Sequence, residues 1–103
     1  MEEQKVRKLL KELTKTAGIE SVRLEFRDMK KKLATTSLDK RTIRLNRVVL
    51  TFPEEIIRYI LAHEVAHLKV KTRYHCKEFR EVLTQLISDD IERLERKLIE
   101  LFL

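Results

Sequence analysis

Cysteine, glycine and proline each occur only once in the 103-residue sequence. Because Cys76 has no partner in the chain, an intrachain disulfide is excluded and an oxidising compartment is not indicated. The scarcity of glycine and proline, with 43% hydrophobic and 39% charged residues, is typical of a compact, helix-rich globular chain. The length predicts one domain over residues 1–103 with a single modest core.

Long apolar runs are also missing. No stretch of the sequence approaches the length of a membrane span. The N-terminal segment "MEEQKVRKLL" lacks the uninterrupted apolar stretch of a signal peptide. We therefore expect a soluble, cytoplasmic protein with no membrane partner.

The charge balance is basic, because 23 Lys and Arg residues against 17 Asp and Glu give a formal net charge of +6. A basic chain raises the question of nucleic acid binding. Charged faces of small domains are, however, usually solvated surface, so a nucleic acid partner is not favoured. Frequent Lys, Arg, Glu and Ile beside one Asn and two Gln fit the surface composition of a thermophile protein.

Hydrophobic periodicity predicts an α+β fold. Apolar residues recur at helical spacing within residues 2–18, and Gly18 is a natural helix stop. Residues 21–27 alternate apolar and polar side chains, as a half-buried strand does. Residues 32–37 predict a weaker second strand, and residues 42–46 a third. We expect a small three-stranded sheet, rich in antiparallel pairs and packed against helices.

A second helix is predicted after the sheet. Thr51 and Glu54 have capping-box spacing, and Pro53 falls in the first turn, where its missing N–H is tolerated. An apolar stripe at residues 56–61, which we assign to the core, runs directly into the segment "HEVAH" at residues 63–67. The two histidines of this segment are therefore expected on a helix.

All three histidines of the chain lie within residues 63–75. His63 and His67 are four positions apart, so on a helix their rings share one face and can reach one metal ion. Glu64 is rotated by about 100° around the helix axis from the first ligand. Its carboxylate therefore stays out of the ligand set yet close to a metal-bound water, which is the His-Glu-x-x-His arrangement.

A catalytic zinc site takes three protein ligands and leaves its fourth position open. His75 is the candidate for the third ligand, and Glu78 and Glu81 on the following helix are alternatives. Cys76 could also bind zinc, but a small buried hydrophobic residue is its more common role. The sequence therefore predicts a Zn²⁺ site made by His75 and the two helix histidines.

These residues resemble the gluzincin group of zinc metallopeptidases, and most closely the minigluzincins, which are small soluble scaffolds from thermophilic prokaryotes. The segment "TIRLNRVVLTFPEEIIRYILAHEVAHL", residues 42–68, looks like the edge strand, the connection and the active-site helix of that family. The similarity covers nearly the whole chain and implies a minimal zincin fold whose last strand borders the cleft. Minigluzincins use histidine as third ligand where most gluzincins use glutamate, which favours His75 over Glu78.

Peptide bond hydrolysis is the predicted reaction. Zinc lowers the pKa of its bound water towards about 7 and polarises the scissile carbonyl, while Glu64 acts as the general base and passes the proton to the leaving amine. A peptide or protein substrate could pair with the strand at residues 42–46 through main-chain hydrogen bonds. Arg73 or Tyr74 could stabilise the oxyanion, although both are more typical of surface positions.

Two other functions could use the same residues. A zinc-stabilised binding module for nucleic acid would hold a structural metal, which usually has four protein ligands, often thiolates. This chain has one cysteine and no fourth histidine. A DNA-associated protease similar to the Spartan-type enzymes would also carry His-Glu-x-x-His, but those enzymes space the third histidine differently. We therefore favour a zinc metalloendopeptidase.

A further helix is predicted near His75 and a last one after Ser88, where Asp89 and Asp90 suit a helix N-terminus. The last helix, within residues 87–103, has a dense apolar end. That end consists of Leu98, Ile99, Leu101, Phe102 and Leu103. It either packs on its own core or covers the cleft of its own or of a second copy, which would give a homodimer. The resemblance to minigluzincins, whose C-terminal segments keep them latent as zymogens, supports the second arrangement.

Overall fold

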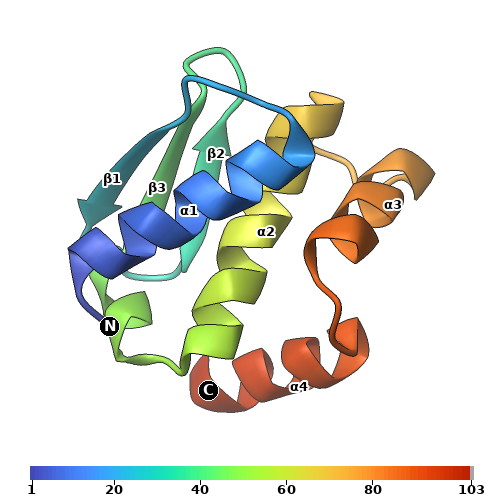
Figure 1. The fold of residues 1–103 in the computed structure, drawn as a ribbon. Helices are drawn as coiled ribbons and strands as arrows, with labels where there is room; N and C mark the ends of the chain where they lie inside the picture. Colours follow the sequence, from blue (N-terminus) through green and yellow to red (C-terminus); the bar gives the residue numbers. More distant parts are fainter. Residues whose placement is uncertain (103) are drawn as a thin grey trace.

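The structure is a computed structural model that describes residues 1–102. Leu103 and the side chain of Phe102, two members of the apolar C-terminal end, lie outside the described residues. The elements, in chain order, are α1 (Glu3–Ala17), β1 (Arg23–Arg27), β2 (Ala34–Ser37), β3 (Thr42–Asn46), the 3-10 helix η1 (Arg47–Thr51), α2 (Glu54–Val70), α3 (Lys77–Leu86) and α4 (Ile91–Phe102) (Figure 1). Among the described residues, none of the helices is both long and apolar enough to span a bilayer.

The three strands form a mixed sheet in the order β1-β3-β2. β1 pairs with β3 in parallel, whereas β2 pairs with β3 antiparallel. The prediction of a sheet rich in antiparallel pairs is therefore wrong for one of the two pairings, that of β1 with β3. The chain reverses direction between β1 and β2 and again between β2 and β3, so β3 runs in the same direction as β1.

The sheet order also corrects the expected position of the strand at residues 42–46. That strand is β3, which lies in the centre of the sheet and has both main-chain edges paired. The edge strand on the side of α2 is β2, whose Thr36 side chain contacts Glu64 of that helix. A peptide that adds to the sheet beside the histidine motif must therefore pair with β2.

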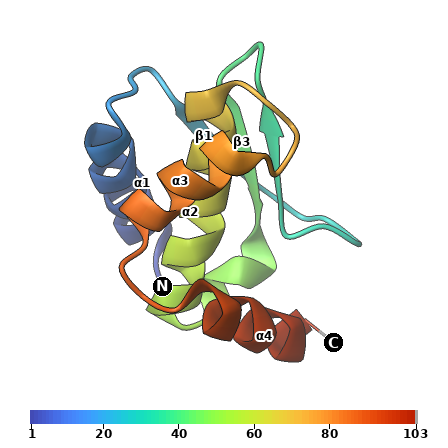
Figure 2. The same ribbon diagram turned by 90° about the vertical axis from the view of Figure 1, so that its right-hand side faces the viewer.

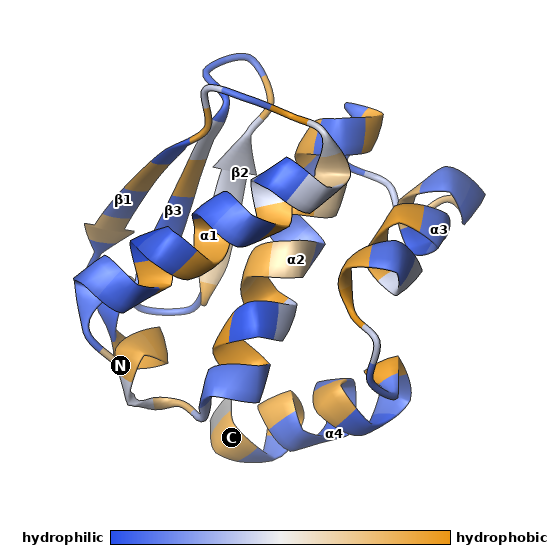
Figure 3. Cartoon of the chain, in the orientation of Figure 1, coloured by the Kyte–Doolittle hydropathy of each residue, from blue (hydrophilic) through white to orange (hydrophobic). Residues whose placement is uncertain are grey.

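One face of the sheet is apolar and the other is polar. On the inner face, Leu24 of β1 lies opposite Ile43 of β3, and their exposed fractions are 7% and 0%. On the outer face, Glu25 forms an ion pair with Arg44. Figure 3 shows this alternation along β1 and β3, and the helices cover the apolar face. The period-two pattern of the sequence thus becomes a one-sided core.

α1 and α2 supply most of the remaining core. Val6, Leu9, Leu10 and Leu13 form the buried side of α1, which ends at Gly18 as predicted. The φ of Gly18 is 73°, a left-handed conformation that glycine adopts without steric cost. The stripe predicted at residues 56–61 is core as expected, because Ile56, Ile57 and Leu61 are all 0% exposed.

The start of α2 differs from the predicted capping box. Thr51 belongs to η1, and Pro53 occupies the N-cap position, where no side chain makes a capping hydrogen bond. The hydroxyl of Thr51 instead donates to the carbonyl of Val48 over 2.7 Å. The sequence therefore has the spacing of a capping box, but Thr51 forms its hydrogen bond within the 3-10 helix and does not cap α2. The helix still begins at Glu54, with two glutamates in its first turn.

The two C-terminal helices begin later than the sequence suggested. α3 starts at Lys77, so His75 lies in the loop before it. α4 starts at Ile91, and its cap is Asp90, whose carboxylate accepts from the backbone N–H of Arg93 at 3.3 Å. Ser88 is therefore not the N-cap. Figure 2 shows α3 and α4 stacked along one side of α2, with α4 nearer the N-terminus of α2.

α4 is attached to α2 by charged and aromatic contacts. The carboxylate of Glu55 accepts hydrogen bonds from Arg93 at 2.9 Å and from Lys97 at 2.6 Å. The hydroxyl of Tyr59 donates to Glu95 over 3.0 Å. Leu94 of α4 is 1% exposed and belongs to the hydrophobic core. The helix with the apolar C-terminal end thus lies against the N-terminal half of the histidine-bearing helix.

Candidate metal centre

The structure brings the three histidines together. His63 and His67 lie one turn apart on α2, and His75 lies between α2 and α3. The ring centroid of His63 is 4.9 Å from each of the other two rings, which are 5.2 Å from one another. One ring nitrogen from each residue lies within 4.8 Å of the others. The residues predicted as ligands therefore form one spatial cluster.

A tight turn after α2 returns the chain towards the helix histidines. α2 ends at Val70, and its C-cap Lys71 is a non-glycine residue in the left-handed conformation with a φ of 59°. The next residue, Thr72, donates its backbone N–H to the carbonyl of His67 over 3.2 Å. Its hydroxyl accepts from the backbone N–H of Tyr74 over 3.1 Å. These bonds fix the path by which the chain reaches His75.

Hydrogen bonds also orient the two helix imidazoles. The Nδ1 atom of His67 donates to the carbonyl of Thr72 over 2.7 Å, and the Nδ1 atom of His63 donates to a carboxylate oxygen of Glu64 over 2.8 Å. Since a neutral imidazole carries one proton, both rings then keep Nε2 as the nitrogen with a free lone pair. A partner on the second nitrogen is the usual arrangement of metal-binding histidines.

Phe79 of α3 lies against all three imidazoles. The distances between ring centroids are 5.1 Å to His63, 4.5 Å to His67 and 4.8 Å to His75. Phe79 is only 2% exposed, so it excludes water from one side of the cluster. In the sequence this residue belongs to the apolar face of a helix, and nothing in its spacing distinguishes it from an ordinary core residue.

Glu64 is nearly buried, with 8% of its surface exposed. One carboxylate oxygen accepts from the hydroxyl of Thr36 over 2.8 Å, and the other accepts from His63. Burial opposes ionisation of Glu64, but the hydrogen bond from His63, the charge of that ring when it is protonated and the hydrogen bond from Thr36 outweigh it and hold the pKa of this carboxyl below its usual range. The residue is therefore ionised at neutral pH, as a general base must be.

Burial has the opposite consequence for His67, whose exposed fraction is 9%. Desolvation lowers the pKa of His67 from its ordinary value, and it outweighs the hydrogen bond to Thr72, which raises that pKa. The neutral imidazole is consequently the favoured form. That form is the one that binds metal, so the apolar surroundings prepare this side chain for a ligand role.

The other ligand candidates lie outside the cluster. Glu81 pairs with Lys77 at the surface of α3, with an N–O distance of 4.0 Å. Glu78 makes contacts with its own backbone and with Cys76, which together lower the pKa of its carboxyl. Cys76 is partly buried against the core. Within the described residues, the group whose ligand atoms converge contains only the three histidines.

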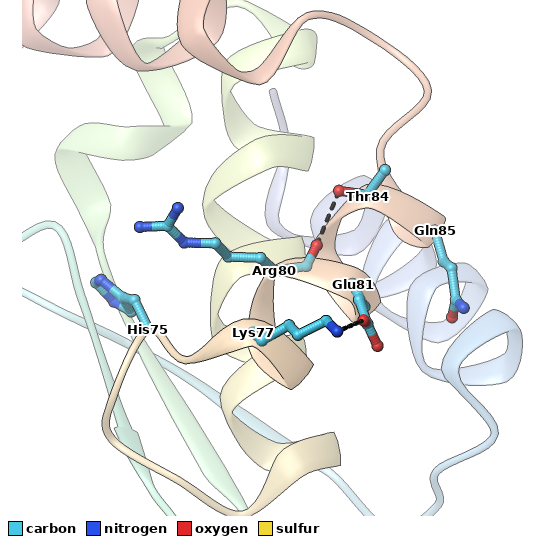
Figure 4. Close-up of a pocket in the computed structure, with 6 residues that line it drawn as sticks. All are labelled: His75, Lys77, Arg80, Glu81, Thr84 and Gln85. Atoms are coloured by element: carbon cyan, nitrogen blue, oxygen red, sulfur yellow. Dashed lines mark hydrogen bonds and ion pairs between the residues drawn. The ribbon is translucent and has the colours of Figure 1, made fainter.

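Several hollows surround the cluster. One of about 130 Å³ is lined by Glu64, His67 and Arg73, so one of the two predicted oxyanion candidates lies beside the motif. The other, Tyr74, is 79% exposed. A hollow of about 650 Å³ lies on the outer side of His75, and Figure 4 shows Arg80 extending in the same direction as that histidine.

The donor set fits a zinc ion. Imidazole nitrogens suit zinc, and three protein ligands match a catalytic site that keeps one position open. The two hydrogen-bonded Nδ1 atoms and the neutral state of His67 agree with this fit. A closed structural site would need a fourth protein ligand, and among the described residues the converging group has three members.

The amino-acid sequence matches the family of YgjP-like metallopeptidase domains over residues 2–100. The chain belongs to this family. An uncharacterised protein of Aquifex aeolicus is 41% identical to this YgjP-like domain over 90 residues, which cover 85% of the chain and 81% of that protein. An uncharacterised protein of Methanocaldococcus jannaschii is 37% identical over 83 residues, which cover 79% of the chain and 76% of that protein.

Two solved structures have the same fold as this YgjP-like domain. The metallopeptidase zymogen abylysin of Pyrococcus abyssi superposes with a TM-score of 0.87 and 31% identity, and the match covers 92% of each chain. The metallopeptidase zymogen jannalysin of Methanocaldococcus jannaschii gives a TM-score of 0.88 and 32% identity, covering 95% of this chain and 97% of that one. The α+β class and the resemblance to minigluzincins are thereby confirmed.

Proposed function

We propose that this YgjP-like domain is a zinc-dependent endopeptidase. In this proposal His63, His67 and His75 bind the zinc ion, and Glu64 is the general base. The observation that carries it is the convergence of one ring nitrogen from each of three histidines within 4.8 Å of one another, beside a buried carboxylate that both His63 and Thr36 hold in place. Membership of a metallopeptidase family supports the same chemistry.

Each residue then has a defined task. A zinc ion, when bound, supplies a Lewis acid that polarises a carbonyl and makes water more acidic. The three imidazoles hold the ion through nitrogens whose orientation is set by the Thr72 carbonyl, the Glu64 carboxylate and the face of Phe79. Glu64 is ionised and close to the cluster, so it can take a proton from water and return it to the leaving amine.

The proposed substrate is a peptide or protein in an extended conformation. β2 is the edge strand on the side of α2, and its Thr36 touches Glu64. A peptide that pairs with the main chain of β2 would therefore pass the general base and the histidines. Main-chain pairing of this kind gives affinity with little selection by side chain.

We also propose that α4 keeps the enzyme latent. Leu98 of α4 lines a hollow of about 310 Å³ together with His63 and Glu64. A second hollow, of about 320 Å³, is lined by His63, His75 and Glu95. Side chains of α4 thus line two hollows that His63 also lines, where a substrate would lie. The same helix could act within one copy or between two copies of the chain, and zymogens are described for both abylysin and jannalysin.

The ligand assignment is tested by metal analysis of purified variants. His63→Ala, His67→Ala and His75→Ala should each lose most of the bound zinc, because two imidazoles do not make a stable catalytic site. Cys76→Ser is the matched control, since this neighbour of His75 lies outside the cluster and should leave the zinc content unchanged. Full zinc retention in His75→Ala would contradict the assignment and move the third ligand to Glu78 or Glu81.

A further inference from the structure

We infer that Thr36 is a positioning residue for the proposed general base. The inference rests on the proposed function, because it concerns how Glu64 is held for catalysis. The hydroxyl of Thr36 donates to Oε1 of Glu64 over 2.8 Å, although the two residues are 28 positions apart in the chain. The bond joins the edge strand of the sheet directly to the helix that carries the His-Glu-x-x-His motif.

The strand register explains why this hydroxyl reaches the helix. Thr36 of β2 lies opposite Ile43 of β3, whose side chain is fully buried on the inner face. Its neighbour Thr35 lies opposite Arg44, which belongs to the polar outer face. Since successive side chains of a strand point to opposite faces, Thr36 is directed towards α2 and Thr35 away from it.

The contact restricts the carboxylate to one arrangement. A glutamate side chain has several rotatable bonds, and a hydroxyl has a single proton to donate. Because Thr36 donates that proton to Oε1, the other oxygen, Oε2, is left on the side of the histidine cluster, 2.8 Å from Nδ1 of His63. Thr36 therefore holds the carboxylate of Glu64 in the orientation that directs its second oxygen towards the histidine cluster.

The position of Thr36 also couples the base to the substrate. Thr36 and Glu64 line the same hollow of about 130 Å³, and β2 is the edge to which a peptide would add. The strand that aligns the peptide therefore also holds the base. Because β2 holds both the peptide and Glu64, the distance between the peptide and the carboxylate is fixed. A small error in that distance would lower the reaction rate strongly.

Three single variants separate positioning from packing. Thr36→Val keeps the shape of the side chain but removes the hydroxyl, Thr36→Ser keeps the hydroxyl, and Thr35→Val makes the same change on the outer face. All are made in the Arg93→Glu background, because the unaltered chain is proposed to be latent and this change removes the ion pair that joins α4 to Glu55. With this parent, a short peptide and zinc-loaded protein, Thr36→Val should lower kcat by about 10- to 100-fold, with KM and zinc content little changed. Thr36→Ser should keep kcat within a few-fold of the parent, and Thr35→Val should match the parent.

The outcomes are distinguishable from failure of the proposed function. If the zinc-loaded parent cleaves peptide and Thr36→Val has the same kcat, or if Thr36→Ser loses as much as Thr36→Val, the positioning role is overturned while the peptidase assignment stands. A change in KM alone would make Thr36 a substrate contact and not a positioning residue. A zinc-loaded Arg93→Glu parent that cleaves no peptide contradicts the peptidase assignment and with it the inference that rests on it.

A second measurement does not use activity. In metal-free protein, the unfolding temperatures of Thr36→Val, Glu64→Ala and the double variant should not be additive, because either single change already removes the hydrogen bond. We expect a deviation from additivity of about 4 °C, which is the shift that a hydrogen-bond-sized coupling produces in a domain of this size. Additive shifts would show that the Thr36 hydroxyl and the Glu64 carboxylate are not coupled, and would overturn the inference.

Discussion

The carbonyl oxygen of Thr72 lies 2.7 Å from Nδ1 of His67, five residues earlier in the chain. This bond exists because α2 stops at Lys71 in a left-handed conformation and the next residue folds back over the last turn. The end of the helix therefore does two things at once. It fixes the tautomer of one proposed ligand, His67, and sends the chain towards a second one, His75.

Lys71 provides the first prediction. Its φ is 59°. A β-branched residue such as valine would adopt this conformation at a cost of about 1–2 kcal/mol. Lys71→Val should therefore lower the unfolding temperature and weaken zinc binding, because the turn that holds His67 is strained. Lys71→Gly, which accepts this conformation freely, should leave both properties at the level of the parent. Equal behaviour of the two variants in thermal unfolding and zinc titration would contradict the role of this turn.

The sequence predicted those parts of the site that depend on local spacing. The four-residue separation of His63 and His67 places their rings on one face of any helix, and the apolar stripe before them predicted a buried helix. Both features depend on helix periodicity alone. His75 was proposed from its proximity in sequence, and the structure places it beside the other two rings.

The remaining parts depend on tertiary structure. Thr36 meets Glu64 only because β2 occupies the edge of the sheet next to α2, and strand order cannot be read from alternation of side chains. Phe79 has the same sequence signature as any core residue of an amphipathic helix. The carbonyl of Thr72 carries no signal at all, since every residue has one.

The pH dependence of stability provides a second prediction. Hydrogen bonds from Arg93 and then Lys97 lower the pKa of Glu55 from 4.5 to about 2. A carboxyl whose pKa is lower in the folded state stabilises the fold above its unfolded pKa, and this contribution is lost as the pH falls towards the folded value. The attachment of α4 should therefore weaken between about pH 4.5 and about pH 2.

Glu55→Gln separates this effect from the titration of other carboxyls. The variant should lose less stability than the parent when the pH is lowered through this range, as measured by thermal unfolding at a series of pH values. Backbone hydrogen exchange should show that the difference is concentrated in α4. Identical pH profiles for the parent and Glu55→Gln would mean that the ion pairs of Glu55 contribute nothing to the folded state.

The proposed latency provides a third prediction. Arg93→Glu places a negative charge beside Glu55 and Asp89, the two present partners of Arg93, so α4 should detach more readily. Zinc-loaded Arg93→Glu should cleave peptide severalfold faster than the parent. Arg96→Glu, the same charge change at an exposed position of α4, should leave the rate unchanged.

Removal of residues 88–103 extends this test to the oligomeric state. If α4 is exchanged between two copies, the full chain should be a dimer and the shortened chain a monomer by light scattering. A shortened chain that stays folded and zinc-loaded, yet is no more active and has the same association state as the full chain, would leave α4 as an ordinary packing element and contradict latency.

The central claim is that Glu64 acts on a peptide substrate as the general base of a zinc site. Its most direct test compares two zinc-loaded proteins that both carry Arg93→Glu, so that α4 is released, and that differ only in Glu64→Gln. The rate of casein cleavage is measured for each. Glutamine keeps the size of the side chain, its amide oxygen can accept from Nδ1 of His63, and its NH2 can donate to the Thr36 hydroxyl, so fold and zinc content should be retained. We predict a loss of cleavage of about 100- to 10,000-fold, as expected when a general base is removed. A Glu64→Gln protein that cleaves casein as fast as its counterpart would contradict the account.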